Sequence, residues 1–370
     1  MRQAGTPPLI TVFGGNGFIG RYVCEALLKT GARLRVAVRD PRKAWFLQPL
    51  GSVGQVSAIQ ADMSKPETIE RAVEGADAVI NLVGVFKGNL EALHVQGPAK
   101  LAAAAKKAGA KAFVHISAIG VDPESESGYS QTKARGEQAI KAAFPKATII
   151  RPSTVFGPED DFTNRFAGMA GWPLLPVIAP NTRFQPVYVR DVGQAVAAAA
   201  LDPKAHGGKT YELAGPEAMT MRELNQRIAS MAGAKPDLID VPDFIASGIA
   251  MFGFLPGAPM NRDQLIMLQN DNVPSGKLPG FKEFGITPTP LGAVAPEWLG
   301  RYKKGDCLTV DDATNNVAPA TCSDAGAYKV LLRKDGTIDD SVCETTEATM
   351  SLYEDADGTA RDFVLCVGPV

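Results

Sequence analysis

Short apolar runs alternate with helical patterns in the first half of the chain, and this alternation constrains the fold more than any other feature. The predicted helices cover residues Phe18–Lys29, Glu67–Val73, Glu91–Ala108 and Ser130–Ala143. The apolar runs between them have the length of strands but lack polar alternation, as buried parallel strands do. They cover Leu9–Phe13, Leu34–Val38, Val56–Gln60, Ala78–Leu82, Ala112–Ser117 and Thr148–Ile150. The pattern predicts an α/β fold of the Rossmann type, a doubly wound, mostly parallel sheet with helices on both faces.

The pattern loosens beyond residue 150, where helices are expected at Arg190–Leu201 and Met221–Ala232. We expect a Rossmann domain over residues 1–202, with 151–185 crossing to the cleft, and a smaller substrate or partner subdomain over 203–304. Composition changes again near Gly305. Only Cys24 precedes this point, whereas the other four cysteines follow it, at Cys307, Cys322, Cys343 and Cys366. Residues 305–370 are therefore predicted to form a small, β-rich tail domain.

Composition excludes several classes of function. The 370 residues are 45% hydrophobic and 21% charged, as in ordinary globular proteins. A net charge of −2 gives no electrostatic reason to expect nucleic acid. No signal peptide is visible, and the longest apolar stretch is interrupted by Pro256 before it reaches the ~20 residues that a membrane span needs. We expect a cytoplasmic protein without a transmembrane span.

The first apolar run leads into the glycine-rich turn "FGGNGFIG", where glycine recurs at every third position. Between a strand and a helix, such a turn lets the backbone approach a pyrophosphate, whose charge is met by the amides of the helix N-terminus. A glycine-rich turn without a ligand is the alternative. We predict dinucleotide binding through residues Gly14, Asn16, Gly17, Phe18, Ile19 and Gly20.

The end of the second strand indicates which dinucleotide. NAD sites tend to place an acidic residue there, to accept a hydrogen bond from the ribose. In "VAVRDPRK" the position is taken by Arg39, with Arg42 and Lys43 close by, and such cations favour the 2′-phosphate of NADP. We predict NADP(H). Asp40 keeps NAD(H) possible, and Arg42 and Lys43 can equally belong to a solvated loop.

A second motif, "YSQTK", places Tyr129 and Lys133 four residues apart, on one face of a helix. A neighbouring ammonium stabilises a phenolate, which makes the Tyr a usable acid at neutral pH, while the Lys can hold a nicotinamide ribose. The pair is common by chance, but here it follows the fifth strand of a dinucleotide fold. Tyr129 and Lys133 are the candidate catalytic residues.

Together these motifs resemble the short-chain dehydrogenase/reductase superfamily in its extended or atypical branch. The resemblance rests on "VFGGNGFIG", "YSQTK", "RPSTVFGP" and "QPVYVRDV" and covers roughly residues 8–300. "LQPLGSVGQVSAIQADMSKPETIERAVEGADAVINLVG" and "AFPKATIIRPSTVFGPEDDFTNRFA" are similar to the nucleotide-binding accessory subunit of respiratory complex I, the alpha-subcomplex subunit nine type. That subunit binds NADPH and is regarded as structural. The resemblance implies cofactor contacts from Asp62, Met63, Leu82, Val83, Gly84, Ser117, Lys133 and Pro152.

One position departs from the active members of the superfamily, which place a Ser or Thr just after strand five. In "VHISAIGV" the register that we favour puts Ala118 there. A missing oxyanion donor costs about a hundredfold or more in rate. Ser117 takes the role if the register shifts by one, and we interpret His115 as a packed core histidine. No metal-ligand spacing occurs, so no metal site is expected.

The tail resembles small exported domains of actinobacterial lipoproteins and septum-formation-like proteins, through "GDC", "AYKV" and its four cysteines. Four cysteines allow three pairings. We favour Cys307–Cys322 with Cys343–Cys366, because each would close a local hairpin. Disulfides belong to oxidising compartments, in conflict with a cytoplasmic main domain. A fused chain or reduced tail cysteines would resolve the conflict.

Three functions remain open. The first is an NADP(H)-holding accessory or assembly protein of respiratory complex I, peripheral on the inner membrane. The second is an NADP-dependent short-chain reductase or a sugar-nucleotide epimerase or dehydratase that uses Tyr129 and Lys133. The third is a sensor that binds the nucleotide without turnover.

The stretch "DFIASGIAMFGFLPG", residues 243–257, carries no charge from Phe244 through Pro256. It therefore cannot build a solvent-facing side. Either it is a buried helix over the substrate cleft, or it contacts respiratory complex subunits or a membrane surface. Exposure of this stretch on an isolated monomer would be unusual.

Overall fold

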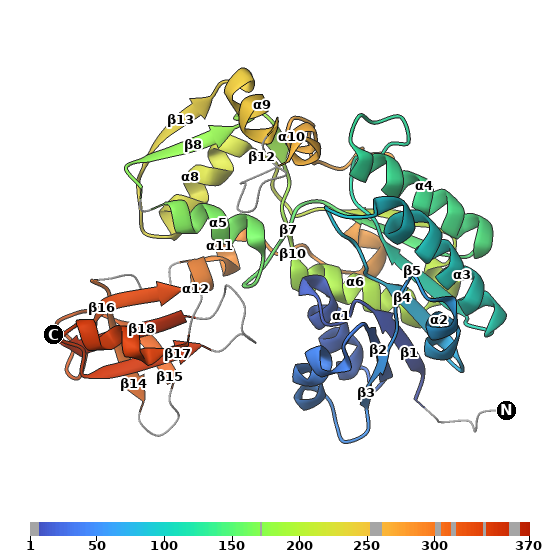
Figure 1. Ribbon diagram of the computed structural model, residues 1–370, viewed down its shortest axis with the longest axis horizontal. Coiled ribbons are helices and arrows are strands. Elements are labelled where there is room, and N and C mark those ends of the chain that lie inside the picture. The colour runs from blue at the N-terminus through green and yellow to red at the C-terminus, as the bar shows by residue number, and fades with distance from the viewer. Residues whose placement is uncertain are drawn as a thin grey trace. The chain divides into compact units, whose positions relative to one another are not determined.

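The computed structural model describes residues 7–170, 172–251, 261–299, 305–311, 316–335, 338–354 and 363–370 (Figure 1). The chain divides into two compact units. The first unit combines Met1–Arg227 with Pro236–Val294, and the second combines Ile228–Lys235 with Ala295–Val370. Each unit is built around its own sheet. In the described ranges, no helix has the length and apolarity that crossing a membrane requires.

The first unit contains a parallel seven-stranded sheet of order β11-β6-β5-β4-β1-β2-β3. The chain runs outward from β1 in both directions, so the order reverses between β1 and β4. The Rossmann-type fold predicted from the alternation is confirmed, but the sheet has one strand more than the six expected. The strands are β1 (Leu9–Phe13), β2 (Arg33–Val38), β3 (Val56–Gln60), β4 (Ala78–Asn81), β5 (Ala112–Ile116), β6 (Thr148–Pro152) and β11 (Thr210–Leu213).

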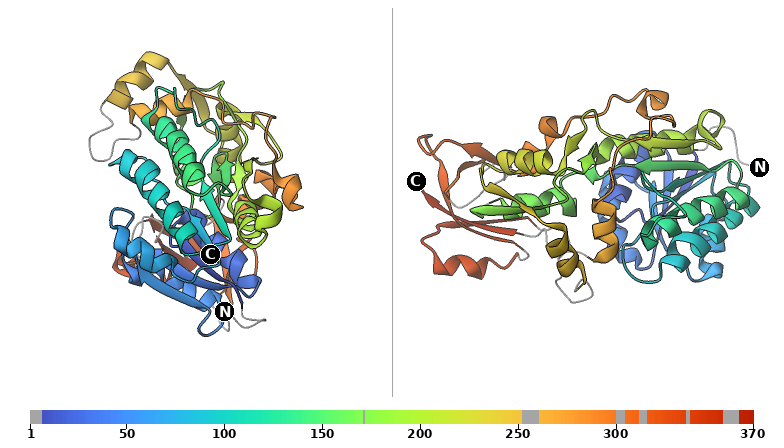
Figure 2. Two further views of the ribbon diagram at one scale, coloured as in Figure 1. Left: turned by 90° about the vertical axis from the view of Figure 1, so that its right-hand side faces the viewer. Right: turned by 90° about the horizontal axis from the view of Figure 1, so that it is seen from above.

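Helices cover both faces of this sheet (Figure 2). On one face, α1 (Phe18–Lys29) and α6 (Val189–Leu201) pack on a core that includes Val12. Its neighbour Phe13 belongs to the core of the other face. Adjacent strand residues point to opposite faces, so burial of both explains why the apolar runs do not alternate. The second face is covered by α2 (Pro66–Val73), α3 (Gly97–Lys107) and α4 (Gly128–Ala143).

Two further helical segments lie between the strands of this sheet. A 3-10 segment, η1 (Pro41–Leu50), follows β2. A π-helical segment, η2 (Glu91–Gln96), leads directly into α3, so the single helix predicted over Glu91–Ala108 begins with a widened turn. Such π segments often occur at functional sites.

The rest of the first unit is made of small paired strands and short helices. Three two-stranded pairs join β7 (Val155–Phe156) with β10 (Val187–Tyr188), β9 (Arg183–Phe184) with β12 (Met219–Thr220), and β8 (Leu174–Ile178) with β13 (Asp237–Val241). The helices are α5 (Asp161–Met169), α7 (Pro203–His206), α9 (Asp243–Met251), α10 (Arg262–Leu268), η3 (Phe281–Phe284) and α11 (Leu291–Val294). Helix α8 (Met221–Met231) is divided between the two units after Arg227, and α12 (Pro296–Leu299) belongs to the second unit.

The tail is a five-stranded antiparallel sheet of order β15-β14-β16-β18-β17. Disulfides join Cys307 to Cys322 and Cys343 to Cys366, which confirms the predicted pairing and the β-rich, cysteine-containing tail. The first disulfide closes the β14–β15 hairpin, whereas the second joins η4 to β18 and closes no hairpin. The elements are β14 (Cys307–Asp311), β15 (Asn316–Ala320), β16 (Tyr328–Asp335), η4 (Asp340–Thr345), β17 (Met350–Glu354) and β18 (Phe363–Pro369).

Candidate dinucleotide site

The glycine-rich turn between β1 and α1 leaves no room for a side chain at Gly14 or Gly20. Gly14 has φ +78°, a left-handed conformation that favours glycine. A Cβ on Gly20 would lie 2.2 Å from the carbonyl oxygen of Gly14, so the turn closes directly onto the helix. Gly17 is the N-cap of α1 and contributes no side-chain hydrogen bond. The predicted residues Asn16, Phe18 and Ile19 stand in this turn and in the first turn of α1, whose N-terminus suits an anion.

Arg39 and Asp40 follow β2 and differ in how far they are engaged. Asp40 caps η1 by accepting a hydrogen bond from the Arg42 amide at 3.1 Å, and it accepts two more from the Arg42 guanidinium at 3.0 Å each. The hydrogen bonds from the Arg42 side chain hold the pKa of Asp40 below its usual value. Arg39 is exposed and forms no hydrogen bond with another residue of the described ranges. The Arg39 guanidinium is therefore available to a ligand, whereas the Asp40 carboxylate is already hydrogen-bonded to Arg42.

The residues that follow β3 and β4 lie at the same carboxyl edge of the sheet as the residues that follow β1 and β2. Asp62 accepts hydrogen bonds from the amide and hydroxyl of Ser64, at 2.9 and 2.7 Å, which lower its pKa. Met63 is buried next to it. The buried Asn81, which the sequence did not single out, accepts a hydrogen bond from the Val83 amide at 3.1 Å and so holds the start of the Leu82–Gly84 loop.

This loop meets the glycine turn at the point where the strand order reverses. A Cβ on Gly14 would lie 3.3 Å from the carbonyl carbon of Leu82 and from the nitrogen of Val83. The carboxyl ends of β1 and β4 thus approach each other closely through their backbones. In doubly wound sheets, ligands bind in the crevice at this switch point.

Tyr129 and Lys133 lie on the first two turns of α4, and both are buried, with 8% and 3% of their surfaces exposed. The Lys133 ammonium donates a hydrogen bond to the Ile116 carbonyl at 2.8 Å and lies 6.0 Å from the centre of the Tyr129 ring. Burial lowers the pKa of Lys133 to about 8. Burial also raises the pKa of Tyr129, and so does the nearby Asp263 carboxylate. These surroundings oppose the phenolate that the predicted catalytic role requires.

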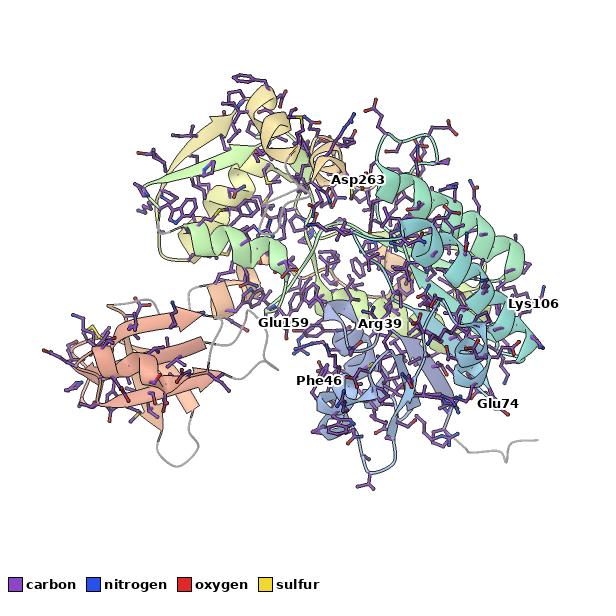
Figure 3. The ribbon with its side chains drawn as sticks, viewed as in Figure 1. Arg39, Phe46, Glu74, Lys106, Glu159 and Asp263 are labelled. Carbon is purple, nitrogen blue, oxygen red and sulfur yellow. A yellow bond between two sulfur atoms is a disulfide. The ribbon has the colours of Figure 1, made fainter. Side chains whose placement is uncertain are left out.

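Asp263 comes from α10, far along the chain from the helix that it contacts (Figure 3). Its two carboxylate oxygens accept hydrogen bonds from the amides of Gly128 and Tyr129, at 2.6 and 3.1 Å. An acidic side chain at this end of α4 satisfies free amides and complements the helix dipole. Sequence reasoning missed this contact, because the residues that meet are 134 or more positions apart.

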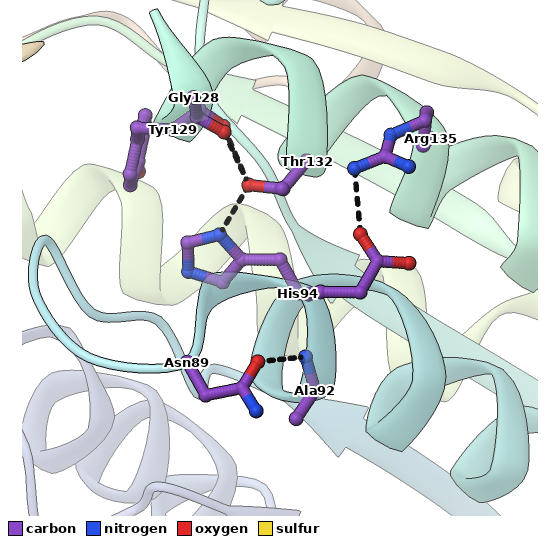
Figure 4. A network of polar contacts seen from close by, with 8 residues as sticks. Asn89, Ala92, His94, Gly128, Tyr129, Thr132 and Arg135 are labelled. Carbon is purple, nitrogen blue, oxygen red and sulfur yellow. Dashed lines mark hydrogen bonds and ion pairs between the residues drawn. The ribbon is translucent and has the colours of Figure 1, made fainter.

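His94 is a second residue of the site that the sequence did not indicate (Figure 4). Its Nε2 accepts a hydrogen bond from the Val85 amide at 3.2 Å, so the proton sits on Nδ1, which donates to the Thr132 hydroxyl at 3.0 Å. That hydroxyl donates in turn to the Gly128 carbonyl at 2.7 Å. Burial lowers the pKa of His94 to about 4. The neutral ring therefore ties the loop after β4 to helix α4, and its edge faces Tyr129 at 5.3 Å.

Ser117 and His115 lie on the same face of β5 and its extension. His115 is fully buried, as expected for a core histidine. Its Nδ1 accepts a hydrogen bond from the side-chain amide of Asn81 at 3.1 Å. The hydroxyl of Ser117 is buried and has no hydrogen-bond partner in the part of the chain that the structure describes. Ala118, the next residue, is half-buried. Within the same ranges, no group of His, Cys, Asp and Glu side chains is arranged to hold a metal ion.

Strand β6 ends at Pro152, and Ser153 and Thr154 connect it to β7. Thr154 donates from its amide and hydroxyl to the Asn272 side-chain oxygen, at 2.6 and 3.0 Å. Apart from Lys133, which lies on the second turn of α4, the residues predicted to contact the cofactor lie at the carboxyl ends of β1 to β6 or in the turns that follow them. The topology brings to one edge what the sequence spreads over more than a hundred residues.

Residues 14–170 match a model of the NAD(P)H-binding family. The structure is also similar to an NADPH-dependent quinone oxidoreductase of Escherichia coli solved with NADPH. That likeness has a TM-score of 0.61 and 21% identity, and it covers 78% of this chain and 98% of the other. It supports the fold. The first unit thus carries a nicotinamide dinucleotide-binding domain.

Two relatives are similar over most of their length. A ceramide reductase of Caulobacter vibrioides is 32% identical over 241 residues, which cover 64% of this chain and 74% of the relative. The mouse (Mus musculus) mitochondrial protein NADH dehydrogenase (ubiquinone) 1 alpha subcomplex subunit 9 is 34% identical over 311 residues, 82% of either chain. This confirms the resemblance drawn from the motifs. The chain belongs to the family of NADH dehydrogenase (ubiquinone) 1 alpha subcomplex subunit 9.

Proposed function

We propose that the protein holds NADP(H) at the carboxyl edge of its seven-stranded sheet as an accessory subunit of a respiratory complex I. The observation that carries the proposal is the match to the mouse subunit over 82% of both chains. The dinucleotide serves in this role as a structural ligand. Its binding energy stabilises the first unit by mass action, since the unfolded chain has no such site.

The surroundings of Tyr129 support retention of the dinucleotide over turnover. The edge of the His94 ring faces the Tyr129 ring, with centres 5.3 Å apart. Its pKa is raised by burial and by Asp263, so the phenol is a poor acid–base group at neutral pH. Ala118 at the place of a hydroxyl donor would remove a further contribution to catalysis.

We propose NADP(H) over NAD(H), because Arg39 is available and Asp40 is engaged by Arg42. A charge-assisted hydrogen bond to the 2′-phosphate contributes about 1.5–3 kcal/mol, or roughly a ten- to hundredfold preference. Calorimetric titration of Arg39→Asp should show a reversed preference. Lys111→Ala, which removes an exposed cation next to β5 and leaves the Asp40–Arg42 pair in place, is the control and should retain the preference for NADP(H). Equal affinity of the unmodified protein for both dinucleotides contradicts the assignment.

The partner surface proposed for residues 243–257 begins on α9. Phe244 and Met251, seven residues apart on one side of this helix, are 77% and 67% exposed, whereas Ala246 and Ala250 are buried. A helix buried on every side does not fit these values. Phe252 to Gly257 lie outside the described residues. We propose that the Phe244 side of α9 contacts respiratory complex subunits or the membrane surface.

Substitutions that place charged side chains on this surface test the proposal. Phe244→Asp with Met251→Asp should detach the protein from the membrane fraction or its complex and leave nucleotide binding unchanged. Phe244→Leu with Met251→Leu should remain bound. Unfolding of the Asp variant would show that the side chains belong to the core.

The proposed location is the periphery of the inner membrane, with the first unit on the cytoplasmic side. The two tail disulfides favour an oxidising compartment for residues 305–370. Labelling of the four tail cysteines with a membrane-permeant thiol reagent in intact cells distinguishes a reducing from an oxidising compartment for the tail. Labelled cysteines place the tail in a reducing compartment.

A second candidate function is an NADP-dependent reductase or epimerase. The ceramide reductase relative favours it, and so does the buried hydroxyl of Ser117, which has no partner among the residues that the structure describes. In this function Tyr129 would donate a proton while Lys133 holds the nicotinamide ribose. The hydroxyl of Ser117 would assist Tyr129 at the substrate oxygen.

The deciding experiment identifies the nucleotide that denaturation releases from the purified protein, and the complex with which the protein migrates on a native gel. Released NADP(H) and comigration with complex I support the accessory function. Substrate-dependent oxidation of NADPH by the isolated protein supports the reductase. A nucleotide-free protein that migrates alone contradicts the accessory function.

A further inference from the structure

We propose that Phe86 is a lid residue that covers Tyr129 when the site is empty and competes with the nicotinamide end of the dinucleotide. The inference rests on the proposed function, which places the nicotinamide ribose at Lys133. The Phe86 ring stacks on the Tyr129 ring, with centres 4.7 Å apart and planes inclined by 19°. Phe86 is itself 50% exposed, whereas Tyr129 is 8% exposed. One exposed ring thus shields the phenol.

The loop that carries Phe86 is fixed at both ends and free between them. At its start, the Val85 amide donates to His94. At its end, the Asn89 side chain accepts a hydrogen bond from the backbone amide of Ala92, which lies in η2, at 3.0 Å. Among the described residues, neither Phe86 nor Lys87 has a hydrogen-bond partner. The ring can therefore leave Tyr129 without breaking a hydrogen bond at either anchor.

Glycines flank this short segment. Gly88 has φ +97°, and a Cβ there would meet no atom within 4 Å. Gly84 precedes Val85, and a Cβ there would lie 3.4 Å from the Lys133 ammonium. The loop thus starts beside the group that would hold the nicotinamide ribose. Phe86, two residues after Gly84, stacks on the neighbouring Tyr129.

In this proposal, the nicotinamide ring whose ribose Lys133 holds takes the side of Tyr129 that Phe86 occupies. Binding is then possible only from the open state of the lid, and the apparent affinity falls by the fraction of protein that is open. An aromatic stack shifts such an equilibrium by about two- to tenfold. The adenosine 2′-phosphate end of the ligand, near Arg39, is not affected by this competition.

The test compares two ligands by calorimetry. NADPH carries the nicotinamide, whereas 2′-phospho-ADP-ribose lacks it and retains the remainder. Phe86→Ala should bind NADPH about two- to tenfold more tightly than the unmodified protein and should leave the affinity for 2′-phospho-ADP-ribose unchanged. Phe86→Leu, which keeps bulk without a flat ring, should fall between. Trp172→Ala removes a similarly exposed aromatic outside the site and should change neither affinity.

Three results overturn the proposal. If Phe86→Ala weakens NADPH binding alone, the ring stacks on the nicotinamide and is not a competitor. If both affinities change by one factor, or neither changes, Phe86 acts on the fold or not at all. If the unmodified protein binds neither ligand, the proposed function fails, and this inference fails with it.

Discussion

In the first unit, helices cover both faces of a parallel seven-stranded sheet, whereas the tail has five antiparallel strands and two disulfides. The sheet of the first unit holds two large apolar cores, one on each face. The apolar cluster of the described tail is built on Leu308, Val330, Leu365 and Val367, with partly buried neighbours. A small domain buries too little surface to offset the loss of chain entropy, so covalent links take over part of that task.

The difference also decides where groups that cost stability can be placed. The first unit carries a buried ammonium on Lys133, a left-handed turn at Gly14 and, on Ser117, a buried hydroxyl that has no partner among the described residues. All three lie at the carboxyl edge of the sheet. In the described part of the tail, no charged side chain is buried. A large core can support a binding site built from unfavourable groups, and a stapled sheet of this size has little stability to spare.

The largest effect is expected when the tail disulfides are reduced. They join residues 15 and 23 positions apart, and loops of this length correspond to about 3 kcal/mol each in the chain-entropy model. Loss of both should unfold the tail and leave nucleotide binding by the first unit intact. Limited proteolysis of the full chain with and without reductant, mapped by mass spectrometry, measures this.

Cys24 provides the internal control for that experiment. It is fully buried in the first unit, and burial raises the pKa of its thiol to about 12. It should stay unreactive toward a thiol reagent while the four tail cysteines become reactive. If reduction exposes Cys24 as well, the units do not unfold independently, and the contrast drawn between them is wrong.

Gly20→Ala should have the next largest effect, confined to the first unit. The new Cβ would lie 2.2 Å from the Gly14 carbonyl oxygen, and the turn must move to admit it. Overpacking of this kind costs about 1–3 kcal/mol, and the displaced turn should lose most of its affinity for the dinucleotide. Gly168→Ala is the matched control, since a Cβ there meets no atom within 4 Å. Calorimetry that finds equal affinities for the two variants contradicts the role of the turn.

The sequence predicted the parts of the molecule whose evidence is local. The limits of β1, β3 and α1 agree with the structure residue for residue, because each is a short apolar or amphipathic run bounded by turn residues. The strand β11 was missed. It has four residues, among them the buried Glu212, whose carboxylate accepts hydrogen bonds from Ser275. Nothing near it in the sequence indicates that partner.

The same distinction holds for the site. The glycine turn and the Tyr129–Lys133 pair are motifs of neighbouring residues, and the sequence indicates them directly. Asp263, His94 and Phe86 reach the site through contacts between distant segments. In the structure, Asn261 and Gln264 form a capping box at the start of α10. This local contact carries no information on which other helix Asp263 will cap.

Replacement of the buried Lys133 should show a smaller effect that depends on pH. Its pKa is about 8 in the folded protein and 10.5 ordinarily, so between these values the unfolded chain binds the proton more strongly. Stability of the ligand-free protein therefore rises with pH in this window, by at most about 3 kcal/mol. Lys133→Met removes this dependence. Urea unfolding of both proteins at pH 8 and pH 9.5 measures it, and a constant difference between them contradicts the buried ammonium.

The smallest effect is expected for Tyr129→Phe. The phenolic oxygen forms no hydrogen bond with the described residues, and the variant keeps the ring contacts with Phe86 and His94. Affinity for NADPH should therefore change by less than about twofold, within the usual range for substitutions that break no specific contact. Lys133→Ala should weaken binding far more, because it removes the ammonium that the proposed function assigns to the ribose. A fluorescence titration with NADPH ranks the two variants. The reverse order would show that the pair belongs to helix packing and not to the nucleotide site.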